Sequence, residues 1–213
     1  MSREDIPDQS DERFGTVTRR NALKVGAAMT GGLALGGTAT GTALGDFDEI
    51  ELPGSDTELF LKLDGINGES EDHVHEDAMD VVAWRWGAAT TGDMHVARGG
   101  GAGRPAFRNI TVTKFIDAAT PVLWQHLATG RHIPRGELIL RRAGGDPVEF
   151  LKIELENILV SGLDTGGAAG KQPGELVTLN FARWNVIYTP QQADGTPGAE
   201  IEFGFDIPRN EPA

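Results

Sequence analysis

Apolar and polar residues alternate in short runs along most of the chain, and glycine-rich turns separate these runs. Alternation with a period of two is typical of β-strands that bury one face. In the first such run, Leu59, Leu61 and Leu63 all fall on one side. The pattern predicts strands at residues 59–64, 79–87, 108–115, 137–142, 150–159, 176–188 and 201–207.

Two of the predicted strands place a basic residue on the same side as apolar residues. In residues 108–115, Lys114 shares a side with Ile110 and Val112. In residues 176–188, the alternation puts these four residues on one side: Val177, Leu179, Phe181 and Arg183.

One segment between the predicted strands has the spacing of a helix. Thr120 is a plausible N-cap, Pro121 suits the first helical position, and Gly130 closes the end. The predicted apolar face of this helix consists of Leu123, Trp124, Leu127 and Ala128.

Three segments without such periodicity are predicted to be loops. Residues 65–77 are acidic, residues 88–105 end in a glycine cluster, and residues 165–174 are glycine-rich. Many short strands separated by such turns, with one helix, predict a mainly β fold, either a barrel or a sandwich.

The first fifty-odd residues differ from the rest of the chain. Residues 1–18 are polar and charged, which predicts disorder. Arg19 and Arg20 precede a mildly apolar segment at residues 25–44, the pattern of a twin-arginine export signal. A transmembrane helix is the weaker alternative, because glycines interrupt the segment and its hydrophobicity is modest.

Export would make the twin-arginine translocase a partner of the precursor. Cleavage is expected near Ala43, and there is no cysteine to receive a lipid, so no stable membrane anchor is expected. The predicted organisation is a disordered region with signal peptide at residues 1–45, a linker at 46–57 and one domain at 58–213.

Composition narrows the classes of function. The formal net charge is −13, with 32 acidic and 19 basic residues, and the five lysines are Lys24, Lys62, Lys114, Lys152 and Lys171. Such an acidic, lysine-poor surface is typical of proteins from halophilic archaea, because high salt screens the self-repulsion. Phosphate backbones would be repelled, so nucleic acid is not an expected partner. The absence of cysteine excludes disulfides and thiolate metal sites.

Few residues suggest chemistry. His73 and His75 could share one strand face and bind a metal with nearby carboxylates, and a metal-dependent hydrolase rests on this pair alone. The glycine clusters at residues 99–104 and 166–171 do not match a phosphate-binding loop. Asn109 begins a glycosylation acceptor pattern at the start of a predicted strand. No nucleophile with a recognisable base is present, so we expect no catalytic residues, no enzymatic activity, no cofactor and no physiological metal.

Several motifs occur together in the order known from one family. They are FLKLDGINGES, DVVAWRWG, GGGAG, TKFID, ATP, RRAGG, TGG and VTLNFA, spread from about Leu59 to Asn210. In these motifs the chain resembles the haemolysin-coregulated protein (Hcp) family, the tube subunits of type VI secretion systems. The resemblance implies a β-barrel of two packed antiparallel sheets with one helix.

The resemblance also implies an assembly. Subunits of the family form homo-hexameric rings that stack into a hollow tube, and the tube can hold small secreted effector proteins, which makes a carrier or chaperone role the alternative function. The loop at residues 88–105 corresponds to the family's ring-stacking loop, with Met94, His95, Arg98, Gly99, Gly100, Gly101 and Arg104 as candidate contacts. The export signal departs from the family pattern, in which the tube forms in the cytoplasm inside a contractile sheath. It favours a secreted subunit that builds an extracellular tube.

Overall fold

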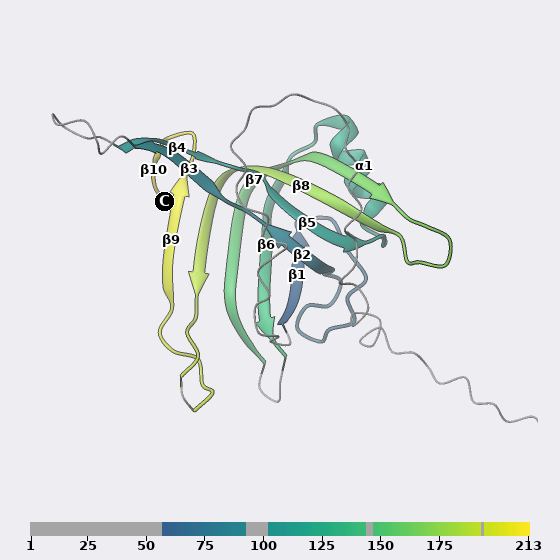
Figure 1. Cartoon of the computed structure of the whole chain (residues 1–213), viewed down its shortest axis with the longest axis horizontal. Coiled ribbons are helices and arrows are strands. Elements are labelled where there is room, and N and C mark those ends of the chain that lie inside the picture. Colours follow the sequence, from purple (N-terminus) through teal and green to yellow (C-terminus); the bar gives the residue numbers. More distant parts are fainter. Residues whose placement is uncertain (1–56, 93–101, 144–146, 193) are drawn as a thin grey trace, which may run out of the picture. The chain divides into compact units, whose positions relative to one another are not determined.

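The computed structural model describes residues 57–92, 102–143, 147–192 and 194–213 (Figure 1). The predicted disordered region and export signal lie outside these ranges, as does the predicted linker at residues 46–57 apart from Thr57, which begins β1. Within these ranges the chain forms ten strands and one helix, in the order β1 Thr57–Leu63, β2 Met79–Arg85, β3 Ala88–Gly92, β4 Ala102–Phe107, β5 Ile110–Phe115, α1 Thr120–Thr129, β6 Ile133–Arg142, β7 Val148–Gly166, β8 Gly174–Tyr188, β9 Ile201–Asp206 and β10 Glu211–Pro212.

Eight of the strands form one antiparallel sheet, and six of these close into a barrel. The strand order is β10-β9-β8-β5-β2-β1-β6-β7, and β7 pairs again with β8, which closes the ring of hydrogen bonds. β8 is long enough to pair with two strands along one edge: its first half pairs with β5 and its last residues pair with β9. The predicted mainly β barrel with one helix is confirmed, and its strands form one continuous sheet.

The core fills the barrel with the apolar residues of the alternating pattern. Leu61, Met79, Ile110, Leu138 and Ile153 come from five different strands, and all are almost completely buried. Burial of each such side chain contributes about 1.5–3 kcal/mol, which is the main favourable term in folding. Leu123 from α1 belongs to the same core cluster, so the helix packs onto the barrel.

The alternation changes phase in the middle of β7 and β8. Ile153 and Leu155 face the core, but so do Ile158 and Val160, which have the opposite parity. Asn157 lies between the two sets with φ 53, a left-handed conformation that asparagine adopts more readily than most residues.

The neighbouring strand β8 changes phase at the same level. Phe181 faces the core, and the next buried residue is Trp184. Because of this shift, the prediction that Arg183 lies on the side of Phe181 is wrong. Arg183 lies on the outer surface, between Glu156 of β7 and Asp206 of β9.

The helix is where predicted, but two details of the prediction are wrong. The N-cap is Ala119, not Thr120, because the Thr120 hydroxyl donates a hydrogen bond to Glu175 Oε1 at 2.9 Å. The buried side of α1 contains Leu123 and His126, whereas Trp124 and Ala128 are exposed. The predicted end is confirmed: Gly130 has φ 63, which glycine adopts without a steric penalty.

The acidic segment at residues 64–78 is a loop, as predicted, and it is folded back on itself. Gly68 N donates to Asp77 O at 2.7 Å, and Ser70 N donates to Ala78 O at 3.0 Å. A Cβ atom at Gly68 would lie 2.4 Å from Ala78 O, so this close approach requires glycine. These contacts fix Asp72 and His75 relative to the barrel.

Candidate functional site

The predicted ring-stacking loop is in part a hairpin. β3 and β4 pair between residues 88 and 107, so the prediction of a continuous loop at residues 88–105 is wrong at both ends. Met94, His95, Arg98, Gly99, Gly100 and Gly101 lie outside the described residues. Arg104 is described and exposed, and its Nη2 donates to the carbonyl oxygen of Ile207 at 2.8 Å. This bond ties the base of the hairpin to the segment that follows β9.

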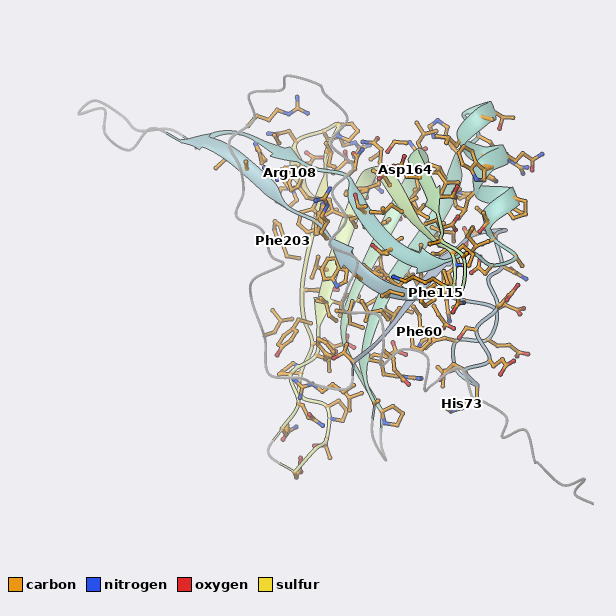
Figure 2. All side chains as sticks on the ribbon, turned by 45° about the vertical axis from the view of Figure 1, so that its right-hand side comes forward. Phe60, His73, Arg108, Phe115, Asp164 and Phe203 are labelled. Carbon is orange, nitrogen blue, oxygen red and sulfur yellow. The ribbon has the colours of Figure 1, made fainter. Side chains whose placement is uncertain are left out.

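The two histidines considered for a metal site do not lie on a strand. Both belong to the turn that precedes β2, where successive side chains do not alternate as in a strand. His73 is exposed, as Figure 2 shows, whereas His75 is buried against Phe60, with ring centroids 4.5 Å apart. Over the described ranges, no group of three or more His, Asp or Glu side chains is arranged to hold a metal ion.

A cluster around Arg141 surrounds His75. The guanidinium binds Glu58 at 2.6 Å and pairs with Asp72, and it lies 4.9 Å from the ring centroid of Phe60. The hydrogen bond from Arg141 holds the pKa of Asp72 well below its usual range. His75 Nε2 lies 3.2 Å from Glu149 Oε1, and burial lowers the pKa of His75.

A second cluster fixes the start of α1. Lys114 Nζ is completely buried and lies 2.6 Å from Asp117 Oδ1 and 2.8 Å from Glu175 Oε1. The same Asp117 oxygen accepts a hydrogen bond from Ala119 N at 2.9 Å, and Thr120 donates to Glu175. These four side chains, Lys114, Asp117, Thr120 and Glu175, form what we call the Lys114 cluster. It connects the end of β5 and the beginning of β8 to the first turn of the helix.

Sequence analysis did not identify either charged cluster. Alternation placed Lys114 with the apolar side of β5, but its partner Glu175 is distant in the sequence. Pattern reading within one strand cannot pair residues on different strands. A basic residue on an apolar side, followed three residues later by an acid, is the signal that was available.

The acceptor pattern at Asn109 falls within a network of neutral side chains on the outer surface. Asn109 Nδ2 donates to Ser161 Oγ at 3.0 Å, and Asn180 Nδ2 donates to Asn109 Oδ1 at 2.8 Å. The hydroxyl oxygens of Thr111 in β5 and Thr178 in β8 lie 3.4 Å apart. We call these five residues the amide–hydroxyl band. A glycan on Asn109 would replace one of the two hydrogens on the nitrogen that donates to Ser161.

The second glycine-rich segment forms the end of the β7–β8 hairpin. β7 ends at Gly166 and β8 begins at Gly174, and Gly170 in the connecting turn has φ 76. Lys171 is exposed at this turn. The segment therefore reverses the chain, as the loop prediction for residues 165–174 expected, although strand pairing extends to both of its edges.

The far end of β8 presents a groove. It has a volume of about 390 Å³, and its lining includes Glu154, Glu156, Arg183, Asn185 and Glu202. Glu156 and Asp206 pair with Arg183, so its charge is neutralised within the chain.

In the part of the chain that the structure describes, no helix has the length and apolarity needed to cross a bilayer.

Comparison with known proteins identifies relatives over this whole domain. A family model described as "Type VI secretion system effector, Hcp" matches residues 60–188. Protein hcp1 of Pseudomonas aeruginosa is 42% identical over 156 residues, which cover 72% of this chain and 96% of that protein.

Solved structures agree with the sequence comparisons. A crystal structure of Hcp1 from Salmonella typhimurium has a TM-score of 0.61 and 31% identity, and the match covers 74% of this chain and 99% of that one. A structure described as a type six secretion system protein has a TM-score of 0.70 and 27% identity, covering 73% of this chain and 99% of that one.

Proposed function

The chain belongs to the haemolysin-coregulated protein (Hcp) family of type VI secretion, and on this basis we propose that it is a structural subunit whose hexameric rings stack into a hollow tube. The observation that carries the proposal is the family match over residues 60–188, which spans the closed barrel from β1 to the end of β8. The role requires surfaces for self-association and no catalytic centre, so the protein is not proposed to be an enzyme.

Electron microscopy of the purified chain tests this proposal. In molar salt, negative-stain images should show rings and stacks of rings, and native mass spectrometry should detect hexamers. Dialysis to about 0.1 M salt, where the Debye length is roughly 10 Å, should separate stacks into rings or monomers, because subunits of net charge −13 then repel one another. Monomers alone in molar salt would exclude the proposed assembly.

We propose that the β3–β4 hairpin and the segment joining its strands stack one ring on the next. The segment contains Met94, which would supply adaptable apolar contact. The bond from Arg104 to Ile207 supports this role by anchoring the base of the hairpin. Deletion of residues 95–101 should leave rings intact and abolish stacking; stacks of normal length would place the contact elsewhere.

We also propose that residues 1–45 export the subunit through the twin-arginine translocase and that the tube forms outside the cell. Arg19 and Arg20 are the features that support this proposal. Their replacement by lysine should retain full-length precursor inside the cell. Secretion of the double variant at the normal level would remove the basis for this route.

A carrier role for small exported proteins is the second candidate function. The amide–hydroxyl band supports it, because short neutral side chains can bond to many partners without imposing a charge. Replacing Asn180, which is exposed, with aspartate should then reduce cargo retention while leaving rings intact. Cargo retained at the wild-type level would argue against this surface.

A further inference from the structure

The outer face of the barrel carries a short apolar row beneath the loop that precedes β2. Phe60 of β1 pairs with Ile139 of β6. Because their neighbours Leu61 and Leu138 face the core, these two side chains point outward. Together with Ala78 they form a cluster separate from the core, and all three are at most 4% exposed. An apolar row on the outside of a barrel stays out of water only while another segment covers it.

Charged side chains border the apolar row on the same outer face. Strand register places Glu58, Arg141 and Glu149 in one row beside it. The charged residues that share this face are Glu58 and Lys62 of β1, Asp80 of β2, Glu137 and Arg141 of β6, and Glu149, Lys152 and Glu154 of β7. A segment that covers the row therefore rests on charged groups as well as on apolar ones.

The covering segment belongs to the loop at residues 64–78, whose base is closed by backbone hydrogen bonds. Ser70 N donates to Ala78 O at 3.0 Å, and Asp77 N donates to Ser70 O at 3.1 Å. Asp77 has φ 61, a left-handed conformation that helps the chain to reverse here. We call residues 71–76, which lie between these bonds, the strap. Its base is fixed, so the strap can leave the barrel without unfolding the strands.

The contacts that hold the strap on the barrel are mainly polar. They are the pair of Asp72 with Arg141, the approach of His75 Nε2 to Glu149 Oε1 at 3.2 Å, and the hydrogen bond from Lys62 Nζ to Val74 O at 3.5 Å. The apolar contact is the packing of the His75 ring on Phe60, with centroids 4.5 Å apart. In Figure 2, His73 of the strap and Phe60 lie on the same side of the barrel. The ring of His75 is thus the part of the strap that covers the apolar row.

His75 is enclosed in surroundings that favour a neutral ring. The residue is 2% exposed, and neither ring nitrogen makes a hydrogen bond within the described ranges, although Nε2 lies close to Glu149. Asp72 is already engaged by Arg141 and by two backbone N–H groups of the strap. A protonated ring would bring a positive charge close to Lys62 and Arg141 without a hydrogen-bonded partner. Burial and these cations outweigh the attraction of Glu149 and lower the pKa of His75.

We propose that the strap is an acid-sensitive cover: protonation of His75 releases residues 71–76 from the barrel and exposes Phe60 and Ile139. The ring takes up a proton more readily in water than in the closed strap, so acid shifts the balance towards the open form. Opening should increase as pH falls from 6.5, the ordinary pKa of histidine, towards the lower pKa of the closed strap.

The pH window separates His75 from the other acid-sensitive group of the strap. The pKa of Asp72 lies below 3.8, so its pair with Arg141 stays charged between pH 7 and pH 5.5. The inference concerns a single subunit and does not depend on the proposed tube. In acid surroundings, an outer surface that is polar at neutral pH would gain an apolar contact site.

Cysteine labelling tests the opening directly, because the chain has no cysteine of its own. Ile139→Cys places a thiol under the strap, and the matched control, Leu138→Cys, places one in the core on the opposite face of β6. Each labelling rate of the full chain is divided by the rate for the same chain unfolded at the same pH, which removes the pH dependence of the thiol. From pH 7 to pH 5.5 the ratio at position 139 should rise about three- to eightfold, and the ratio at position 138 should not change.

Two glutamine substitutions within the strap assign the response to one histidine. His75→Gln keeps a polar side chain but cannot take up a proton, so the acid response at position 139 should disappear. His73→Gln changes an exposed histidine two residues earlier and should leave the response unchanged. An acid response that survives His75→Gln, or that His73→Gln abolishes, would overturn the assignment.

The remaining outcomes of the labelling are equally decisive. A rise shared by positions 138 and 139 would mean that the whole barrel opens in acid, and it would overturn a local cover. Equal ratios at pH 7 and pH 5.5 for position 139 would show that His75 is protonated without leaving Phe60, which would also overturn the proposal.

A glutamate-specific protease provides a second measurement on the chain without substitutions. Cleavage after Glu71 or Glu76 requires the strap to leave the barrel, so its rate follows the population of the open form. Corrected for the rate on a free peptide of the same sequence at each pH, cleavage should rise by the same factor as the labelling, and mass spectrometry identifies the bond. Unchanged cleavage between pH 7 and pH 5.5 would overturn the proposal even where Ile139→Cys fails to fold.

Discussion

Lys114 and Arg183 have the same chemical surroundings and different solvent exposure. Each is a cation paired with two carboxylates: Lys114 with Asp117 and Glu175, and Arg183 with Glu156 and Asp206. The Lys114 and Glu175 side chains are both 0% exposed, whereas the Arg183 side chain is 41% exposed. The contact distances are similar, at 2.6–2.8 Å and 2.7–3.0 Å.

The difference shows that contact distance alone does not determine how much an ion pair contributes to stability. Water screens the pair of Arg183 with exposed Glu156, whereas Asp206, whose side chain is 9% exposed, has Arg209 as a further cationic partner. Inside the barrel, each charge of the Lys114 cluster depends on its partners, because water cannot replace them. Arg141, whose side chain is 5% exposed while its partner Glu58 is 35% exposed, falls between the two cases.

The largest predicted effect is that of Lys114→Met. The substitution replaces the cation with an apolar side chain of similar length and leaves the Glu175 and Asp117 carboxylates without a counter-charge. The free energy of unfolding should fall by about 3–5 kcal/mol, measured by chemical denaturation at neutral pH and constant salt.

The double variant Lys114→Met, Glu175→Leu sharpens this prediction. With both members of the innermost pair replaced by apolar groups, the fully buried carboxylate is gone, and Asp117, whose side chain is 12% exposed, is the carboxylate of the cluster that stays without its counter-charge. Much of the lost stability should return, as for other buried ion pairs replaced by apolar residues. Losses that simply add in the double variant would show that the two charges do not depend on each other.

Lowering the pH should reveal how much the pair of Arg141 with Asp72, the intermediate case, contributes to stability. The hydrogen bond from Arg141 depresses the pKa of Asp72 below its ordinary value of 3.8 in the folded state. Asp72 therefore contributes stability above pH 4, and the contribution is lost as pH falls through 3.8 towards the folded pKa. Asp72→Asn should lower stability at pH 7 and flatten its decline between about pH 4 and pH 2, where the wild type is still losing stability. Parallel pH profiles for the two proteins would contradict this assignment.

His75 is expected to have a smaller effect on the pH dependence of stability, at a pH closer to neutral. Burial lowers its pKa from 6.5, and Lys62 and Arg141 add to this, while Glu149 and Asp72 act in the opposite direction. The folded state thus favours neutral imidazole, and stability should decrease as pH falls from 6.5 towards the lower folded pKa. His75→Gln should remove this step in denaturation curves measured between pH 7 and pH 5. A step that persists would assign the titration to another group.

Strand positions were predictable because alternation is a local consequence of burying one face of a sheet. That rule found the runs containing Leu61, Ile110 and Leu179, all of which are buried in the core. It failed at Arg183, because the left-handed Asn157 and the phase change in β8 reverse the faces within one strand. The alternating pattern predicts neither the left-handed conformation of Asn157 nor the phase change in β8.

The charged clusters could not be predicted for a different reason. Thr120 was expected to cap the helix because that is its local preference. Instead, the Thr120 hydroxyl donates a hydrogen bond to Glu175, which lies on a strand fifty-five residues away in the sequence. Likewise, the phase change that exposes Arg183 brings it between Glu156 and Asp206 of two different strands. Such long-range pairings are set by strand register, which one sequence does not specify.

Arg183→Ala is predicted to have the smallest effect. Arg183 and Glu156 are both more than 40% exposed, so water can solvate Glu156 once the guanidinium is removed. The Asp206 side chain is 9% exposed, but it keeps the hydrogen bond from Arg209 N at 2.9 Å and the Arg209 guanidinium at 3.8 Å. The denaturation midpoint should stay within experimental error of the wild type at molar salt, where the remaining attraction is screened. At low salt a small loss should appear, because the unscreened repulsion between the two carboxylates then acts across β8. A loss as large as that of Lys114→Met, at either salt concentration, would show that exposure does not govern the strength of these pairs.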